Sequence, residues 1–151
     1  MSITIRALEE TDLDAVSALS MQMPDASPRE GIAGRFRWLG RRAAHENAFF
    51  VAESEPFCTI VGFVHVHGVT LLGSIAYAEI GSLVVDHAHR RQGIGRMLVS
   101  ASERWAKEHA FATMRLRPGR ARPPEAHGFY RQLGYELVPP TALFHKEIGA
   151  N

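Results

Sequence analysis

The spacing of apolar side chains predicts four helices. In these segments apolar residues recur every three or four positions, which places them on one face of a helix. The first three helices carry Leu13, Val16 and Leu19; Ile32, Phe36, Leu39 and Ala43; and Ile94, Leu98, Ala101 and Trp105, while the fourth covers residues 125–133. Ser27, Pro28 and Glu30 form a capping-box pattern before the second helix. Gly134 is the expected C-cap of the fourth.

Seven strands are predicted from alternating apolar and polar positions or from short runs of β-branched residues. They lie around Ile3 and Ile5, at 49–53, 59–66 and 76–85, around Met114 and Leu116, and at 135–138 and 142–148. The three central runs have short connections and are expected to form an antiparallel meander. The predicted order, β-α-α-β-β-β-α-β-α-β-β, describes an α+β fold with a mixed, mostly antiparallel sheet flanked by helices.

The composition is that of a single globular domain covering residues 1–151. Hydrophobic residues make up 46% of the chain, which is enough for a core, and the net charge is +1. This charge gives no electrostatic reason to expect nucleic acid as a partner. Neither a signal peptide nor an apolar run near the roughly 20 residues of a membrane span is recognisable. Together with the single cysteine, Cys58, this leads us to expect a cytoplasmic protein without membrane contact.

The segment 83–96 carries the clearest chemical signal. A predicted strand runs into a short loop, and Gly93 and Gly95 then open the long helix. The start of a helix presents unpaired N–H groups and a partial positive charge, and so binds anions. Glycine lets a ligand approach the backbone closely, and Arg90, Arg91 and Arg96 add positive charge. The pattern indicates a pyrophosphate held by successive backbone amides.

These glycines have other interpretations as well. They could merely cap the strand and the helix. The Gly-Lys-Ser/Thr sequence of a P-loop is absent, and Leu98 stands where a dinucleotide fingerprint needs its third glycine.

The run Arg90-x-x-Gly93-x-Gly95 resembles the signature of the GNAT acetyltransferase superfamily, Arg/Gln-x-x-Gly-x-Gly/Ala. Residues 126–135 are similar to the family's Phe-Tyr-x-x-x-Gly-Phe/Tyr element, and residues 5–7 followed by Asp12 and Leu13 resemble its usual start. The resemblance covers nearly the whole chain and implies acetyl-CoA as the donor. The CoA-binding residues that it implies are Leu83, Val84, Val85, Arg90, Arg91, Gln92, Gly93, Ile94, Gly95 and Arg96.

The resemblance implies that the backbone of Leu83 to Val85 contacts the pantetheine and the acetyl carbonyl. It also implies that Arg91 to Arg96 supply the backbone amides that bind the pyrophosphate. One departure concerns the pantetheine. Family members often carry Asn or Ser after the strand that matches residues 114–117, whereas this chain continues as Arg117-Pro118-Gly119-Arg120. No residue is assigned to that contact.

Two residues are the candidates for acid–base catalysis. An attacking amine must lose a proton, because a lysine-like amine has a pKa of about 10.4. Glu79 resembles the catalytic glutamate of the histone-acetyltransferase branch, and Ser82 and His87 are weaker alternatives. Tyr130, in the second motif, is the expected acid for the thiolate leaving group. The competing interpretations are a solvent-facing carboxylate for Glu79 and a core tyrosine for Tyr130.

The remaining candidates point to no further chemistry. Four histidines stand two residues apart in pairs, His65 with His67 and His87 with His89. Nothing in the sequence brings them together around one ion, so no metal site is expected. Cys58 is expected to be a small buried residue. The helical Trp38 and Trp105 are expected in the core or at an interface.

The sequence therefore predicts an N-acetyltransferase that transfers the acetyl group of acetyl-CoA to a primary amine of a small molecule or peptide. A non-catalytic acyl-CoA sensor or partner subunit is the alternative, and a homodimer is left open. The acceptor is expected to bind near residues 21–35 and the turn 139–141, where no motif identifies it.

Overall fold

The computed structural model describes residues 2–23, 31–117, 125–139 and 142–149. The chain divides into two compact units, Met1–Ala121 and Arg122–Asn151, and each is described by itself. The capping-box pattern at Ser27, Pro28 and Glu30 lies outside the described residues, as does the segment that follows Arg117. A single domain over 1–151 stays a prediction.

The first unit is built on a five-stranded sheet in the order β1-β2-β3-β4-β5. The strands are β1 (Ile3–Ala7), β2 (Asn47–Ser54), β3 (Thr59–Val69), β4 (Tyr77–Val85) and β5 (Met114–Leu116). The first four pair antiparallel, and β5 pairs parallel with β4. This confirms the predicted meander and the mixed, mostly antiparallel sheet.

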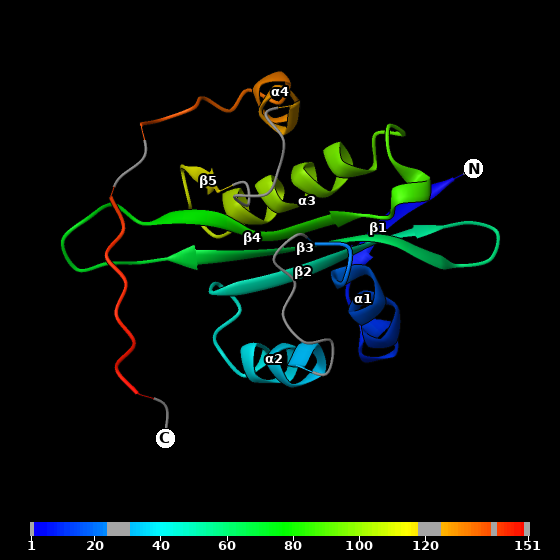
Figure 1. Cartoon of the computed structure of the whole chain (residues 1–151), viewed down its shortest axis with the longest axis horizontal. Helices are drawn as coiled ribbons and strands as arrows, with labels where there is room; N and C mark the ends of the chain where they lie inside the picture. The colour runs from blue at the N-terminus through cyan, green and yellow to red at the C-terminus, as the bar shows by residue number, and fades with distance from the viewer. Residues whose placement is uncertain (1, 24–30, 118–124, 140–141, 150–151) are drawn as a thin grey trace. The chain divides into compact units, whose positions relative to one another are not determined.

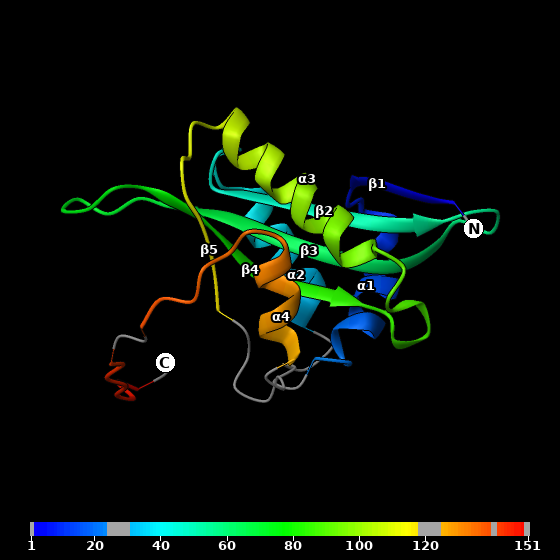
Figure 2. The same ribbon diagram turned by 90° about the horizontal axis from the view of Figure 1, so that it is seen from above.

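Helices cover both faces of this sheet. They are α1 (Leu13–Ser20), α2 (Gly31–Gly40) and α3 (Ile94–Glu108), with short 3-10 turns at η1 (Glu10–Asp12) and η2 (His87–His89). Figure 1 shows α1 and α2 on one face of the sheet and α3 on the other. In Figure 2 α3 lies over the strands of the sheet and crosses them obliquely.

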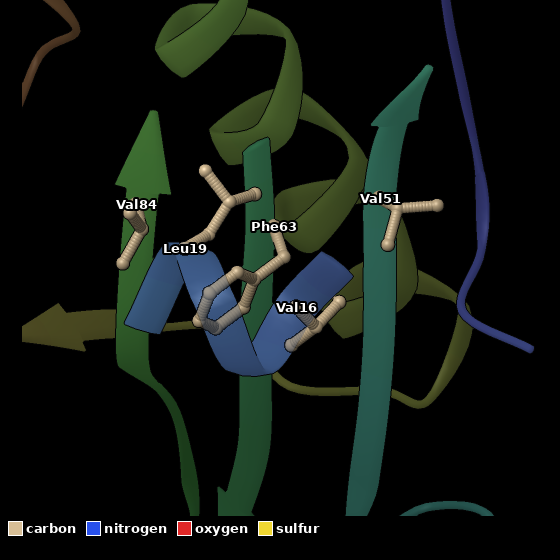
Figure 3. Close-up of a cluster of buried hydrophobic side chains, with 5 residues drawn as sticks. All are labelled: Val16, Leu19, Val51, Phe63 and Val84. Atoms are coloured by element: carbon tan, nitrogen blue, oxygen red, sulfur yellow. The ribbon is translucent and has the colours of Figure 1, made fainter. Parts of the chain in front are cut away.

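The core on the α1 face is a compact apolar cluster. Val16 and Leu19 of α1 point at a row of strand residues, Val51, Phe63 and Val84, and all five are buried (Figure 3). The register pairs Val51 with Phe63 and Phe63 with Val84, so the row runs straight across three strands. The predicted amphipathic face of α1 is therefore the face that packs on the sheet.

The core on the other face belongs to α3. Ile94, Leu98 and Val99 are fully buried, and Trp105 packs in a cluster with Val66. Gly62 of β3 allows this close approach. A Cβ atom there would lie 2.9 Å from the Val84 carbonyl oxygen and 3.2 Å from Leu98 Cδ1.

The second unit contains α4 (Glu125–Gln132). Gly134 follows with a φ of +94°. The N–H groups of Gly134 and Tyr135 donate to the carbonyls of Arg131 and Tyr130 at 3.0 and 3.1 Å. This is a Schellman C-cap, and it confirms the predicted role of Gly134.

The two strands predicted at 135–138 and 142–148 are not formed. The described residues beyond α4 have no regular secondary structure. Alternating apolar residues form a strand only where a sheet pairs their backbone and covers one face, and here these side chains are exposed. They are Leu137, Val138, Leu143, Phe144 and Ile148.

One smaller expectation is wrong: Cys58 is exposed, not buried, in the turn between β2 and β3. Of the two tryptophans, Trp105 is in the core. Trp38 is 57% exposed, so for it the expectation of an interface stays a prediction. Among the described helices none is long and apolar enough to cross a membrane.

Candidate active site

The predicted phosphate-binding loop lies at the start of α3. Gly93 is the N-cap in the left-handed conformation, with a φ of +80°, and no side chain caps the helix. Arg91 also has a positive φ, 63°, which is a strained conformation for a residue with a Cβ. Residues 90–93 are exposed. The helix start therefore presents its N–H groups to the outside without a side chain competing for them.

The side chain of Gln22, just after α1, holds the loop between β4 and α3 through two hydrogen bonds. Gln22 donates from Nε2 to Asp86 Oδ1 at 3.1 Å and accepts at Oε1 from the His87 backbone N–H, also at 3.1 Å. His89 Nδ1 lies 3.0 Å from the other Asp86 oxygen. The hydrogen bond from Gln22, with a smaller effect of His89, holds the pKa of Asp86 below its ordinary value. Both oxygens of this carboxylate are thus engaged within the loop.

The sequence could not reveal Gln22, because it lies 64 residues from Asp86 and belongs to no motif. Only the packing of α1 against β4 brings the two side chains together.

Strand β4 changes its pairing halfway along. It pairs with β5 from Ala78 to Ile80 and then continues to Val85. On the other side His65 pairs with Ser82 and Val66 pairs with Ile80, so Gly81 is left over as a bulge. Leu83, Val84 and Val85, the residues implied to contact pantetheine, all follow this bulge.

Glu79 lies in a row of polar residues that crosses four strands. The register pairs Asn47 with His67, His67 with Glu79, and Glu79 with Arg115. We call these four residues the polar row. His67 Nε2 is 3.2 Å from Glu79 Oε2, and Arg117 Nε is 3.6 Å from Glu79 Oε1. The Glu79 side chain is 20% exposed. It is therefore an oriented, largely covered carboxylate and not a solvent-facing one.

His65 lies two residues before His67 on β3, and its contacts hold one end of the polar row in place. Burial, and to a smaller extent His67, lower the pKa of His65 to about 4, so its ring is neutral at neutral pH. The ring stacks on Phe49 at 4.5 Å between centroids. Its Nε2–H donates to Asn47 Oδ1 at 2.8 Å. This fixes Asn47 at the end of the row.

The candidate residues fall into three places. Glu79 and the weaker candidate Ser82 are on β4, and His87 is in η2 with the phosphate-binding loop. Tyr130 is on α4 in the second unit, where its ring meets Phe129 and Tyr135 edge-on at 5.0 and 6.3 Å. Because the two units are described separately, the acid role of Tyr130 stays a prediction.

The histidines form no three-ligand group within the described part of the chain. The group with metal-ligand spacing there is Glu53, Glu55 and Cys58, beside the β2–β3 turn. It lies outside the polar row and the α3 start, and exposed acidic groups of this kind are common without an ion.

Comparison with known proteins identifies the family. The sequence model of the acetyltransferase (GNAT) domain matches residues 45–137, a stretch that runs from β2 to beyond α4. The chain therefore belongs to the GNAT acetyltransferase family, and it is an acyltransferase.

Solved structures share the whole fold at low sequence identity. A transcriptional regulator from Bacillus halodurans C-125 is 24% identical, with a TM-score of 0.81 over 96% of this chain and 100% of that one. Aminoglycoside 6'-N-acetyltransferase AAC(6')-Ih from Acinetobacter baumannii is 20% identical, with a TM-score of 0.80 over 98% and 100%. AAC(6')-Iy, solved with a bisubstrate analogue of CoA, is 18% identical, with a TM-score of 0.83 over 97% and 99%.

Proposed function

We propose that this chain is an N-acetyltransferase that transfers the acetyl group of acetyl-CoA to a primary amine of a small molecule or peptide. The observation that carries the proposal is the course of β4. Its first half holds the oriented carboxylate of Glu79, and its end leads into the uncapped start of α3. A single strand thus connects a candidate base to a candidate phosphate site.

The donor is bound at the start of α3. The backbone N–H groups from Arg91 to Arg96 receive the pyrophosphate, and the side chains of Arg90, Arg91 and Arg96 add positive charge. The backbone of Leu83 to Val85 receives the pantetheine and the acetyl carbonyl. The CoA bisubstrate analogue bound by AAC(6')-Iy, whose fold matches 97% of this chain, supports acetyl-CoA in this role.

Glu79 removes the proton from the acceptor amine, either directly or through a water molecule. His67 and Arg117 hold its two oxygens in place, which leaves the carboxylate oriented before the acceptor arrives. The neutral amine attacks the thioester carbon, and a backbone N–H of β4 stabilises the negative charge that develops on the carbonyl oxygen. The carbon–sulfur bond then breaks.

Tyr130 returns a proton to the departing CoA thiolate. A phenol has a pKa near 10, which suits donation to a thiolate. Its position in the motif at 126–135 supports this role.

The test is an acceptor panel with acetyl-CoA, in which free thiol release and the mass of the acetylated amine are both followed. At least one primary amine is expected to give stoichiometric thiol and acetylated product. Glu79→Gln should slow that reaction, whereas Glu55→Gln, in the distant β2–β3 turn, should not. Thiol release without any acetylated amine across the panel would contradict the proposal.

A further inference from the structure

A pocket opens at one end of the polar row. Its volume is about 500 Å³, and its lining includes Asn47 and His67. Volumes of this size are typical of sites for small molecules. Since His67 also contacts Glu79 at 3.2 Å, the pocket adjoins the carboxylate proposed as the base.

The walls of the pocket mix polar residues with apolar ones, and part of the apolar surface is aromatic. Trp38 and Leu39 contribute from α2, and Phe111 contributes from the segment after α3. Trp38 is 57% exposed, although an indole this large is normally covered. An exposed indole at the edge of a pocket is suited to pack against an apolar ligand.

Backbone contacts hold part of the pocket wall in place. The Gly68 N–H donates to the Glu46 carbonyl at 2.9 Å, and the Glu46 N–H donates to the Ala43 carbonyl, also at 2.9 Å. A Cβ at Gly68 would lie only 2.3 Å from Phe111 Cζ. The absence of a side chain at Gly68 therefore lets the Phe111 ring pack against β3 in the pocket lining.

The charges around the pocket are already balanced. Arg42 Nε is 2.6 Å from Glu46 Oε2, and the Arg42 guanidinium lies over the Trp38 ring at 5.2 Å. Among the described residues that line the pocket, Glu46 is the only carboxylate. A ligand with several ammonium groups would leave most of them without a partner and would meet the positive charge of Arg42.

We propose that this pocket binds the body of the acceptor, and that the acceptor is a small monoamine with an apolar, preferably aromatic, body. The body contacts Trp38 and Phe111 in the pocket lining, and the single amine reaches past His67 to Glu79. Polyamines and aminoglycosides are disfavoured by the same pocket. This inference rests on the proposed N-acetyltransferase function and specifies its substrate class.

The test compares 2-phenylethylamine and tryptamine with spermidine and an aminoglycoside as acceptors for the wild-type protein. The monoamines are expected to have a kcat/KM at least about tenfold higher. Trp38→Ala should raise the KM for 2-phenylethylamine about tenfold and leave the KM for acetyl-CoA unchanged. Phe57→Ala, which removes an exposed ring in the β2–β3 turn, is the matched control and should change neither.

Direct binding separates failure of this inference from failure of the proposed function. Calorimetry with 2-phenylethylamine alone should show binding that Trp38→Ala weakens. If no amine is acetylated but this Trp38-dependent binding is found, the pocket assignment stands and the catalytic function falls. If spermidine or the aminoglycoside is the better acceptor, or if Trp38→Ala leaves the monoamine KM and binding unchanged, the pocket assignment is wrong.

Discussion

At the scale of single residues, Glu79 is a largely covered carboxylate with a contact at each oxygen. Its two oxygens face His67 and Arg117 at 3.2 and 3.6 Å, and the side chain is mostly covered. The competing interpretation of Glu79 as a solvent-facing strand residue does not fit this geometry.

The base role of Glu79 makes a prediction about pH dependence. Glu79→Gln should lower activity most at low pH, where little of the acceptor amine is neutral and the reaction depends most on a base. The loss should be partly recovered at high pH, where more of the amine is neutral. Steady-state kinetics across pH is the measurement. A raised KM with unchanged kcat would mean that Glu79 only binds the ammonium form, and a wholly unchanged profile would remove it from both roles.

Tyr130 is predicted to act on turnover rather than on donor affinity. Tyr130→Phe keeps the ring and its edge-on contacts with Phe129 and Tyr135 but removes the proton donor. Turnover should fall by about 10²–10⁴-fold, with acetyl-CoA affinity close to that of the wild type. Tyr135→Phe, on the neighbouring ring, is the control. Turnover of Tyr130→Phe within a few-fold of the wild type would show that another group is the acid.

An ion pair between Arg6 and Asp12 explains in physical terms why the N-terminal residues match the family's usual start. Arg6 donates to both Asp12 oxygens, at 2.8 and 2.9 Å, and also to Glu53 at 2.8 Å. Asp12 accepts as well from the Glu9 N–H at 2.8 Å. The spacing of Arg6 and Asp12 in the sequence thus reflects an ion pair that ties β1 to the start of α1.

This ion pair predicts an acid-sensitive contribution to stability. The hydrogen bonds from Arg6 are the main reason why the pKa of Asp12 is lowered below 3.8. The ionised carboxylate therefore stabilises the fold at pH values above about 4, and this contribution is lost as the pH falls through the depressed pKa. Asp12→Asn should lose about 1–3 kcal/mol at neutral pH and show a flatter acid limb. Denaturant unfolding at several pH values measures both, and parallel acid limbs would contradict the assignment.

At the scale of elements, Gly62 determines how closely α3 approaches the sheet. Gly62→Ala places a methyl group 2.9 Å from the Val84 carbonyl oxygen, so the helix or the strand must shift. We expect a loss of about 1–3 kcal/mol in the free energy of unfolding. Gly73→Ala is the control, because a Cβ there meets nothing within 4 Å. Equal melting temperatures for the two variants would refute this packing role.

The elements and the antiparallel meander were largely predictable from the sequence, and the register of the strands was not. The four helices and first five strands follow from periodicity, because α1, α3 and the meander have strongly patterned faces. The contact of His67 with Glu79 depends on the register of β3 against β4, which includes the bulge at Gly81. No local pattern encodes that register. The predicted C-terminal strands failed for the related reason that apolar alternation does not specify a pairing partner.

At the scale of the whole molecule, the family assignment and the polar row are consistent with each other. The family assignment gives the class of enzyme, but it does not identify the acceptor. The GNAT domain match and the shared fold define the class of enzyme. Likeness at 18–24% identity carries the fold and leaves the acceptor to be inferred from this chain's own residues. The balanced charges of the pocket beside the polar row favour a monoamine over the aminoglycoside antibiotic named for AAC(6')-Ih.

The central claim is that acetyl-CoA binds at the start of α3, and calorimetry on Gly95→Asp tests it most directly. The substitution puts bulk and negative charge where the pyrophosphate is proposed to lie. An acidic residue in the first turn of a helix is itself favourable, so the melting temperature should not fall. The account predicts wild-type binding of acetyl-CoA and a loss of about tenfold or more in the variant. Wild-type affinity in a folded Gly95→Asp protein would contradict it.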